Sequence, residues 1–154
     1  RRSSDLDIMS KISPVGPVYQ AGTLSGNPIA TVAGLRTLEI ISKPGFFKDL
    51  NKKANTFFSE LKSFISKREL PLTLNHVNSM GCLYFKAGGV KNFSDATQSD
   101  IGQFKQYFAQ LIKGGIYIAP SQYEAMFISS AHKKDDLKKT SQVMAQALKT
   151  LFNQ

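Results

Sequence analysis

The spacing of apolar residues in 46–67 constrains the fold of this 154-residue chain more than any other feature. These residues recur at steps of three and four, which places them on one face of a long helix. Lysines lie between them, so the helix is expected to be amphipathic and to pack against a core on one side only. The apolar positions are Phe47, Leu50, Ala54, Phe57, Leu61 and Phe64.

Shorter patterns follow this helix in a mixed order. The chain after residue 45 predicts helix, strand, strand, helix, strand, strand and helix. The predicted elements are 46–67, 72–77, 81–87, 99–113, 116–119, 126–129 and 134–152. The polar stretch GGVKNFSDATQSD between the second strand and the second helix is predicted as a loop. Such an order is typical of a small antiparallel sheet covered by helices, which is the α+β class.

The beginning of the chain has a different character. Residues 1–27 are irregular apart from a short helix expected around 5–12. Asn27 is a good N-cap and Pro28 a good first helical residue, because the missing N–H of proline is not needed there. The helix expected over 29–41 is apolar nearly all round, and such a helix is usually buried.

The formal net charge of +9 raises nucleic acid as a partner. However, the lysines occur singly or in pairs along helical patterns, with no dense run and no stripe interleaved with aromatic residues. This distribution is typical of solvated helix faces, so no nucleic-acid partner is expected. A basic binding or interaction module remains the alternative from a different class of function.

Several other classes of site and location are disfavoured. No apolar run has the length of a membrane span and no signal peptide opens the chain, so no membrane partner is expected. Cys82 is the only cysteine and is expected to be a small buried hydrophobe, which fits a reducing, cytoplasmic location. His76 and His132 lack neighbouring Cys, Asp or Glu at ligand spacing, so no metal site is expected.

The stretch GPVYQAGTLSGNP, residues 16–28, is a glycine-rich loop that leads into a capped helix. Backbone N–H groups and a helix N-terminus can together bind a phosphate, and Thr23 adds a hydroxyl donor. The loop matches neither of the common phosphate-loop patterns. A structural turn therefore remains open beside an anion site at Gly22 and Thr23.

The stretch APSQYEA, residues 119–125, places Glu124 between two apolar strand-like segments. A carboxylate in such a position is seldom buried without a partner. Either a cation pairs with Glu124 or the side chain faces a cleft, and the residues alone leave both interpretations open.

Taken together, these stretches resemble one family. GPVYQAGTLSGNPIA, then GCLYF, NFSDATQSD and GIYIAPSQYEAMFISSAH are similar, in the same order, to the glutamate-1-semialdehyde aminomutase family. That family is in the class III branch of the aminotransferases that use pyridoxal 5'-phosphate (PLP). The resemblance spans residues 1 to about 152. It implies the C-terminal part of the type I aminotransferase fold, in which a small α+β domain follows a large cofactor domain.

The resemblance also implies roles for four residues. Gly22 and Thr23 match a loop that reaches across a homodimer and binds the cofactor phosphate held by the neighbouring subunit. Tyr19 and Glu124 match residues at the substrate end of the site, where a carboxylate can hold an amino group. The family works from the pyridoxamine form of the cofactor and converts glutamate-1-semialdehyde to 5-aminolevulinate, a tetrapyrrole precursor.

The lysine that binds the cofactor covalently in this family lies upstream of the residues that match Arg1. No catalytic residue is therefore expected within this chain, and the chain alone is expected to be inactive. The expected domain organisation is the tail of the large PLP-binding domain, a connecting helix and the small α+β domain, in 1–27, 28–45 and 46–154. Another class III enzyme, a transaminase of ω-amino acids, remains the alternative, although the surroundings of Tyr19 and Glu124 favour the aminomutase.

Overall fold

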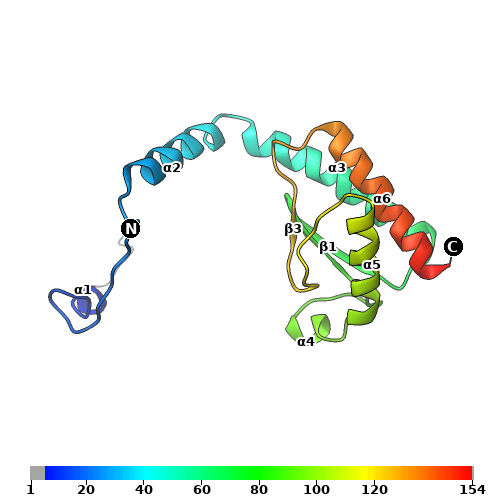
Figure 1. Cartoon of the computed structure of the whole chain (residues 1–154), viewed down its shortest axis with the longest axis horizontal. Helices are drawn as coiled ribbons and strands as arrows, with labels where there is room; N and C mark the ends of the chain where they lie inside the picture. Colours follow the sequence, from blue (N-terminus) through cyan, green and yellow to red (C-terminus); the bar gives the residue numbers. More distant parts are fainter. Residues whose placement is uncertain (1–5, 154) are drawn as a thin grey trace. The chain divides into compact units, whose positions relative to one another are not determined.

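The computed structural model describes residues 6–153, and the chain divides into two compact units between Pro44 and Gly45. Each unit is described by itself, and all its elements except β2 are labelled in Figure 1. The first unit contains α1 (Leu6–Met9) and α2 (Pro28–Ile41). The second contains α3 (Phe46–Lys67), β1 (Thr73–Val77), β2 (Met80–Tyr84), α4 (Phe93–Ala96), α5 (Ile101–Lys113), β3 (Met126–Phe127) and α6 (Lys134–Phe152).

The second unit is built on a three-stranded antiparallel sheet in the order β1-β2-β3. β1 and β2 form a hairpin in which Leu74 is opposite Leu83, and β3 pairs with the start of β2, with Met126 opposite Gly81. Because side chains alternate along a strand, Gly81 and Leu83 lie on one face of the sheet and Cys82 on the other. Gly81 and Leu83 are buried, so their face is the core side.

Helix α3 packs on this core face where β2 has no side chain. The ring of Phe58 lies against Gly81 and is fully buried, and it stacks on the His76 ring with 5.1 Å between centroids. A methyl group at position 81 would overlap the Phe58 ring. Burial of a phenylalanine of this kind stabilises a fold by about 2–3 kcal/mol. The glycine therefore sets how closely the helix approaches the sheet.

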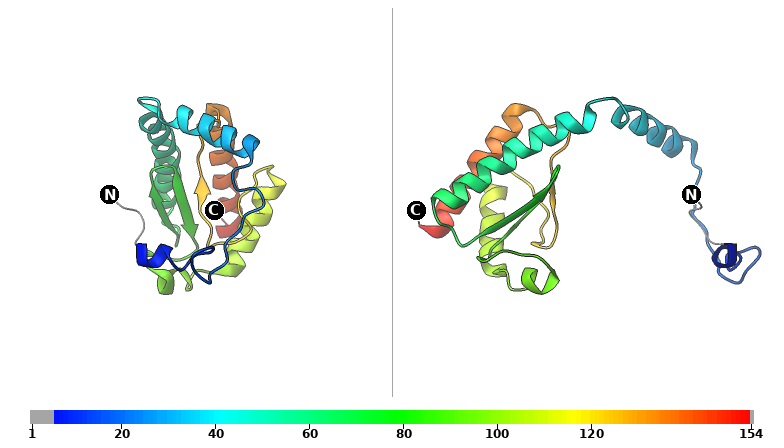
Figure 2. Two further views of the ribbon diagram at one scale, coloured as in Figure 1. Left: turned by 90° about the vertical axis from the view of Figure 1, so that its left-hand side faces the viewer. Right: turned by 180° about the vertical axis from the view of Figure 1, so that it is seen from behind.

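Helices α5 and α6 complete the core from the same side, and Figure 2 shows the three long helices of this unit gathered along the sheet. Phe104 and Tyr107 of α5 lie near the ring of Phe85, at centroid distances of 6.3 and 5.4 Å. Met144 and Leu148 of α6 are fully buried in the same apolar cluster. This helix-covered antiparallel sheet confirms the α+β prediction.

Several predicted elements differ from the structure. Residues 116–119 do not form a strand; the N–H of Ile116 instead donates to the Leu111 carbonyl at the end of α5, 2.9 Å away. β2 ends at Tyr84, because the Phe85 N–H donates to the Ser99 hydroxyl rather than to a strand. β3 is two residues long where four were predicted. The predicted loop after β2 contains α4, which Asn92 caps.

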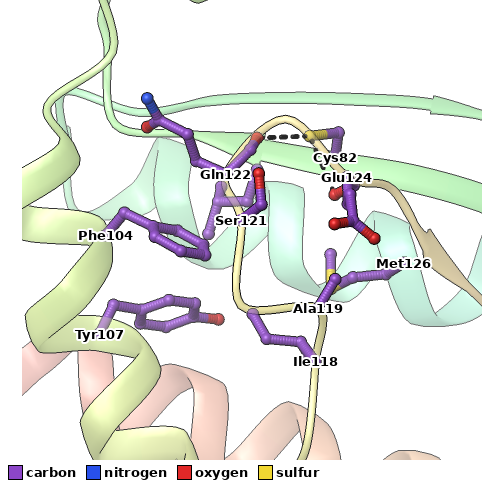
Figure 3. Close-up of a pocket in the computed structure, with 10 residues that line it drawn as sticks. Cys82, Phe104, Tyr107, Ile118, Ala119, Ser121, Gln122, Glu124 and Met126 are labelled. Atoms are coloured by element: carbon purple, nitrogen blue, oxygen red, sulfur yellow. Dashed lines mark hydrogen bonds between the residues drawn. The ribbon is translucent and has the colours of Figure 1, made fainter.

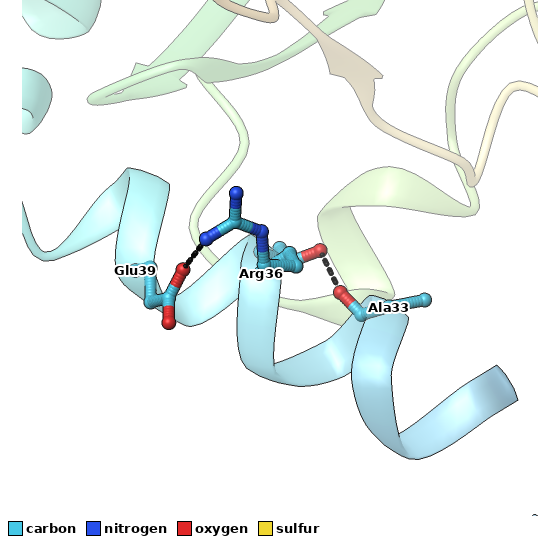
Figure 4. A network of polar contacts seen from close by, with 4 residues as sticks. Ala33, Arg36 and Glu39 are labelled. Carbon is cyan, nitrogen blue, oxygen red and sulfur yellow. Dashed lines mark hydrogen bonds and ion pairs between the residues drawn. The ribbon is translucent and has the colours of Figure 1, made fainter. Parts of the chain in front are cut away.

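Helix α2 was expected to be buried, and that prediction is wrong for its own unit, where none of its residues is buried. Its boundaries are as predicted: Asn27 accepts from the Ala30 N–H and Pro28 is the first residue. Among the described residues, the side-chain polar contacts within α2 are the Arg36–Glu39 ion pair and a bond from the Thr37 hydroxyl to the Ala33 carbonyl (Figure 4). Its exposed apolar side chains are Ile29, Val32, Leu35, Leu38 and Ile40.

We predict that Gly81→Ala lowers the free energy of unfolding of the second unit by about 1–3 kcal/mol, because the added methyl forces the Phe58 ring out of its place. Urea denaturation followed by circular dichroism measures the loss. Gly34→Ala is the matched control, since a methyl group there meets no atom within 4 Å and lies in the other unit. An unchanged midpoint for Gly81→Ala would show that α3 does not depend on this contact.

Candidate functional site

Tyr19 lies at the end of a closed loop in the first unit. The Val18 N–H donates to the Lys11 carbonyl (2.9 Å) and the Ser13 N–H to the Val18 carbonyl (2.8 Å), which ties both ends of the loop together. Tyr19 comes directly after this closure and its side chain is 82% exposed. Its phenol is therefore presented to the surroundings of the unit rather than to its own chain.

Gly22 and Thr23 follow on the same exposed stretch. The Ser25 N–H donates to the Gly22 carbonyl (3.0 Å), which closes a turn, and the Ser25 hydroxyl lies so close to Gly22 that a side chain would collide with it. A second turn is closed by the Asn27 N–H and the Leu24 carbonyl, at 3.0 Å. Two successive turns thus lead directly into the N-terminus of α2.

The donors of this loop are available to an anion. Within residues 6–153, the Thr23 hydroxyl and the backbone N–H groups of Thr23 and Leu24 have no hydrogen-bond partner, and both residues are exposed. Unpaired N–H groups beside a helix N-terminus suit a phosphate or carboxylate. The loop therefore has the donor set that a phosphate needs, although it has no lysine or arginine of its own.

Glu124 lies in the second unit, at the end of a tight turn before β3. The Glu124 N–H donates to the Ser121 carbonyl (3.2 Å), and the Tyr123 N–H to the Ser121 hydroxyl (3.2 Å). The Glu124 side chain is exposed and makes no ion pair with any described residue. A cation partner within these residues was one of the two interpretations of Glu124, and the structure does not support it. The carboxylate is free to accept a cationic group.

A small pocket lies beneath this turn, with a volume of about 20 Å³. Figure 3 shows it between α5 and the segment that leads to Glu124, with the Tyr107 hydroxyl directed toward Ile118. Tyr107 is 1% exposed and Gln122 is 4% exposed. Neither the hydroxyl nor the amide has a hydrogen-bond partner among the described residues.

Cys82 borders the same pocket from the sheet. Its side chain is half-buried, whereas a small buried hydrophobe was expected. Desolvation raises the pKa of this thiol above its ordinary value, and a hydrogen bond with Tyr84 opposes part of the rise. That hydrogen bond, with some burial, raises the pKa of Tyr84 to about 12. Burial also raises the pKa of Tyr107. All three groups are thus neutral donors at physiological pH.

The structure brings Tyr19, Gly22 and Thr23 together on one loop and places Glu124 in the other unit. Sequence reasoning missed the groups that surround the Glu124 turn, namely Cys82, Tyr107 and Gln122. The alternation in GCLYF was the available signal, because it places Cys82 opposite the core-facing Gly81 and Leu83. No cluster of metal-ligating side chains occurs in the part of the chain that the structure describes, and no described helix is long and apolar enough to cross a membrane.

Solved structures identify the fold. The chain matches a β-phenylalanine aminotransferase from Variovorax paradoxus with a TM-score of 0.77 and 19% identity, over 97% of this chain and 34% of that one. It also matches a glutamate-1-semialdehyde aminomutase from Pseudomonas aeruginosa, solved with PMP, with a TM-score of 0.74 and 16% identity, over 88% and 31%. The fold is that of a part of the PLP-dependent transaminases, as expected.

Proteins with similar sequences show a closer relationship than the solved structures do. The chain is 44% identical over 146 residues to glutamate-1-semialdehyde 2,1-aminomutase 2 of Brevibacillus brevis, which covers 95% of the chain and 34% of that protein. It is 44% identical over 143 residues to the glutamate-1-semialdehyde 2,1-aminomutase of Thermus thermophilus, with 92% and 34% covered. No known family profile matches the chain. The chain is a homologue of the C-terminal part of the glutamate-1-semialdehyde 2,1-aminomutases and spans about a third of their length.

We predict that Tyr107→Phe leaves the stability of the second unit unchanged or raises it by up to about 1 kcal/mol. The reason is that the buried hydroxyl loses its hydrogen bonds to water on folding and gains none in return. Thermal unfolding measures the change. Tyr107→Leu serves as the comparison, because it also removes ring packing and is expected to cost about 1–3 kcal/mol. A loss above about 1 kcal/mol for Tyr107→Phe would show that the hydroxyl has a partner in solution.

Proposed function

We propose that this chain supplies one side of the active site of a glutamate-1-semialdehyde 2,1-aminomutase, which converts glutamate-1-semialdehyde to 5-aminolevulinate. The observation that carries the proposal is the 44% identity over 95% of the chain to proteins of that name. The free Thr23 donors and the unpaired Glu124 carboxylate add to it, because they are the groups that a phosphate and an amino group require.

The cofactor proposed for the complete enzyme is PLP, in its pyridoxamine form. PLP acts as an electron sink for bonds at the carbon that carries the amino group. In this proposal the Thr23 hydroxyl and the N–H groups of Thr23 and Leu24 donate to the phosphate. Gly22 allows the close approach of backbone to anion. The absence of a cation on this loop fits a phosphate that is held mainly by groups outside it.

The substrate contacts are proposed for the other two residues. Glu124 accepts hydrogen bonds from a substrate amino group, since its carboxylate is exposed and has no cation partner among the described residues. Tyr19 lines the substrate end of the site with its exposed phenol. Both residues bind and orient the substrate, and neither exchanges a proton in this proposal.

The remaining proposals concern assembly. Residues 1–27 are the tail of the large cofactor domain, 28–45 the connecting helix and 46–154 the small domain. The complete enzyme is a homodimer in which the Gly22–Thr23 loop serves the neighbouring subunit, and other parts of the enzyme cover the apolar side chains of α2. The lysine that holds the cofactor lies outside this chain, so the chain alone is inactive. Cytoplasm is the proposed location, since the free Cys82 thiol fits a reducing compartment.

A transaminase of ω-amino acids is the second candidate. An omega-transaminase from Sphaerobacter thermophilus has a similar fold, with a TM-score of 0.76. Its identity to this chain is 18%, whereas the relatives named as aminomutases reach 44%. The sequence relationship therefore favours the aminomutase reaction.

A chimera tests the proposal. The chain replaces the aligned third of the Brevibacillus brevis relative, and the product is assayed for 5-aminolevulinate formation. Thr23→Ala is expected to raise the dissociation constant for PLP about tenfold, and Glu124→Gln to raise KM for glutamate-1-semialdehyde about tenfold, because each removes a hydrogen bond with a charged group. Thr31→Ala and Glu60→Gln are the matched controls, on exposed faces of α2 and α3.

Two results would count against the proposal. A chimera that transfers amino groups from ω-amino donors but forms no 5-aminolevulinate would favour the transaminase. Equal effects of Thr23→Ala and Thr31→Ala on PLP affinity would remove the phosphate role of the loop.

A further inference from the structure

The turn that carries Glu124 lies just beyond the end of a strand pairing. The β2–β3 ladder ends where Met126 is opposite Gly81, and Glu124 precedes Met126 by two residues. No ladder hydrogen bond therefore holds the backbone of Glu124 to the sheet. Another contact must fix the turn if the carboxylate is to have a defined position.

Cys82 supplies that contact. It is the next residue of β2 after the ladder ends, and its Sγ lies 3.5 Å from the Gln122 carbonyl oxygen and 3.7 Å from that of Glu124. Figure 3 shows both contacts, with the thiol beside the two carbonyl groups of the turn. A thiol can donate to either oxygen, so one side chain from the sheet reaches both ends of the segment 122–124.

The side chain of Gln122 is buried and packs in place, but no other hydrogen bond among the described residues joins the turn to β2. The internal bonds of the turn, from the N–H groups of Tyr123 and Glu124 to Ser121, fix its shape but not its place on the sheet. The buried Gln122 amide has no partner among the described residues. In the described structure, therefore, the thiol makes the hydrogen bonds between the turn and β2.

The thiol is suited to this role because it keeps its proton. Burial raises its pKa, so at neutral pH the sulfur carries the hydrogen that the carbonyl oxygens accept. A thiolate would instead repel both carbonyl oxygens.

We propose that Cys82 is a positioning residue, whose one S–H donates to the carbonyl of Gln122 or of Glu124 and so holds the Glu124 carboxylate in place. The anchoring follows from the contacts alone. Its consequence for the substrate rests on the function proposed above for Glu124.

Two substitutions separate hydrogen bonding from packing. Cys82→Val keeps a similar volume and removes the donor, whereas Cys82→Ser keeps a donor. Hydrogen exchange of the Tyr123 and Glu124 amides in the 154-residue chain, measured by NMR, is expected to accelerate about threefold in Cys82→Val, as for the loss of about one weak hydrogen bond. Cys82→Ser is expected to stay within about twofold of the original chain.

Thr73→Val is the matched control. It removes a hydroxyl from the paired strand β1 that donates to the Lys86 carbonyl rather than to the thiol or the turn, so exchange at Tyr123 and Glu124 is expected to stay unchanged. Equal exchange in Cys82→Val and the original chain would overturn the proposal, and so would equal acceleration in Cys82→Val and Cys82→Ser.

The chimera supplies the catalytic measurement. Cys82→Val is expected to raise KM for glutamate-1-semialdehyde about threefold with kcat nearly unchanged, and Cys82→Ser to restore it. Suppose that neither Cys82→Val nor Glu124→Gln changes KM, while Cys82→Val still accelerates amide exchange. That outcome would overturn the proposed role of Glu124 and leave the anchoring in place. A KM that responds to Glu124→Gln but not to Cys82→Val would overturn the positioning role.

Discussion

The missing side chain at Gly81 is the constraint on which the second unit depends. It lets the Phe58 ring lie against the sheet, and the ring fixes how closely α3 approaches β2. The same glycine is opposite Met126, so it also lies where β3 joins the sheet. The neighbouring Cys82 then points to the opposite face and meets the turn that carries Glu124. Helix packing, strand pairing and the candidate substrate contact thus meet within two residues of β2.

The long helices were predictable because their signals are local and strong. The three- and four-residue spacing of 46–67 gives α3 with its observed limits, and Asn27-Pro28 marks the start of α2. The strands were less predictable, because a strand forms only beside a partner strand and the spacing of apolar residues does not identify that partner. Residues 116–119 have a suitable apolar pattern, but the Ile116 N–H is used at the end of α5. The expectation that α2 is buried was wrong because none of the described residues of its own unit covers it.

The candidate site was predictable from resemblance rather than from physics alone. Gly22 and Thr23 are a weak phosphate signal by themselves, and Glu124 by itself allowed a structural ion pair. The structure adds that the Thr23 donors and the Glu124 carboxylate have no partners among the described residues. It also shows the contact of Cys82 with the Glu124 turn, which depends on where the pairing of β2 with β3 ends. The end of that pairing is set by tertiary contacts and cannot be read from the sequence pattern.

In the proposed function, this chain contributes phosphate and substrate contacts to a site whose lysine lies elsewhere. Incubation with PLP, reduction with borohydride and peptide mass mapping test this proposal directly. The chain alone is expected to show no lysine modified in preference to the others, and the chimera is expected to carry one modified lysine outside residues 1–154. Stoichiometric modification of one lysine within residues 1–154, accompanied by formation of 5-aminolevulinate by the chain alone, would contradict the proposal.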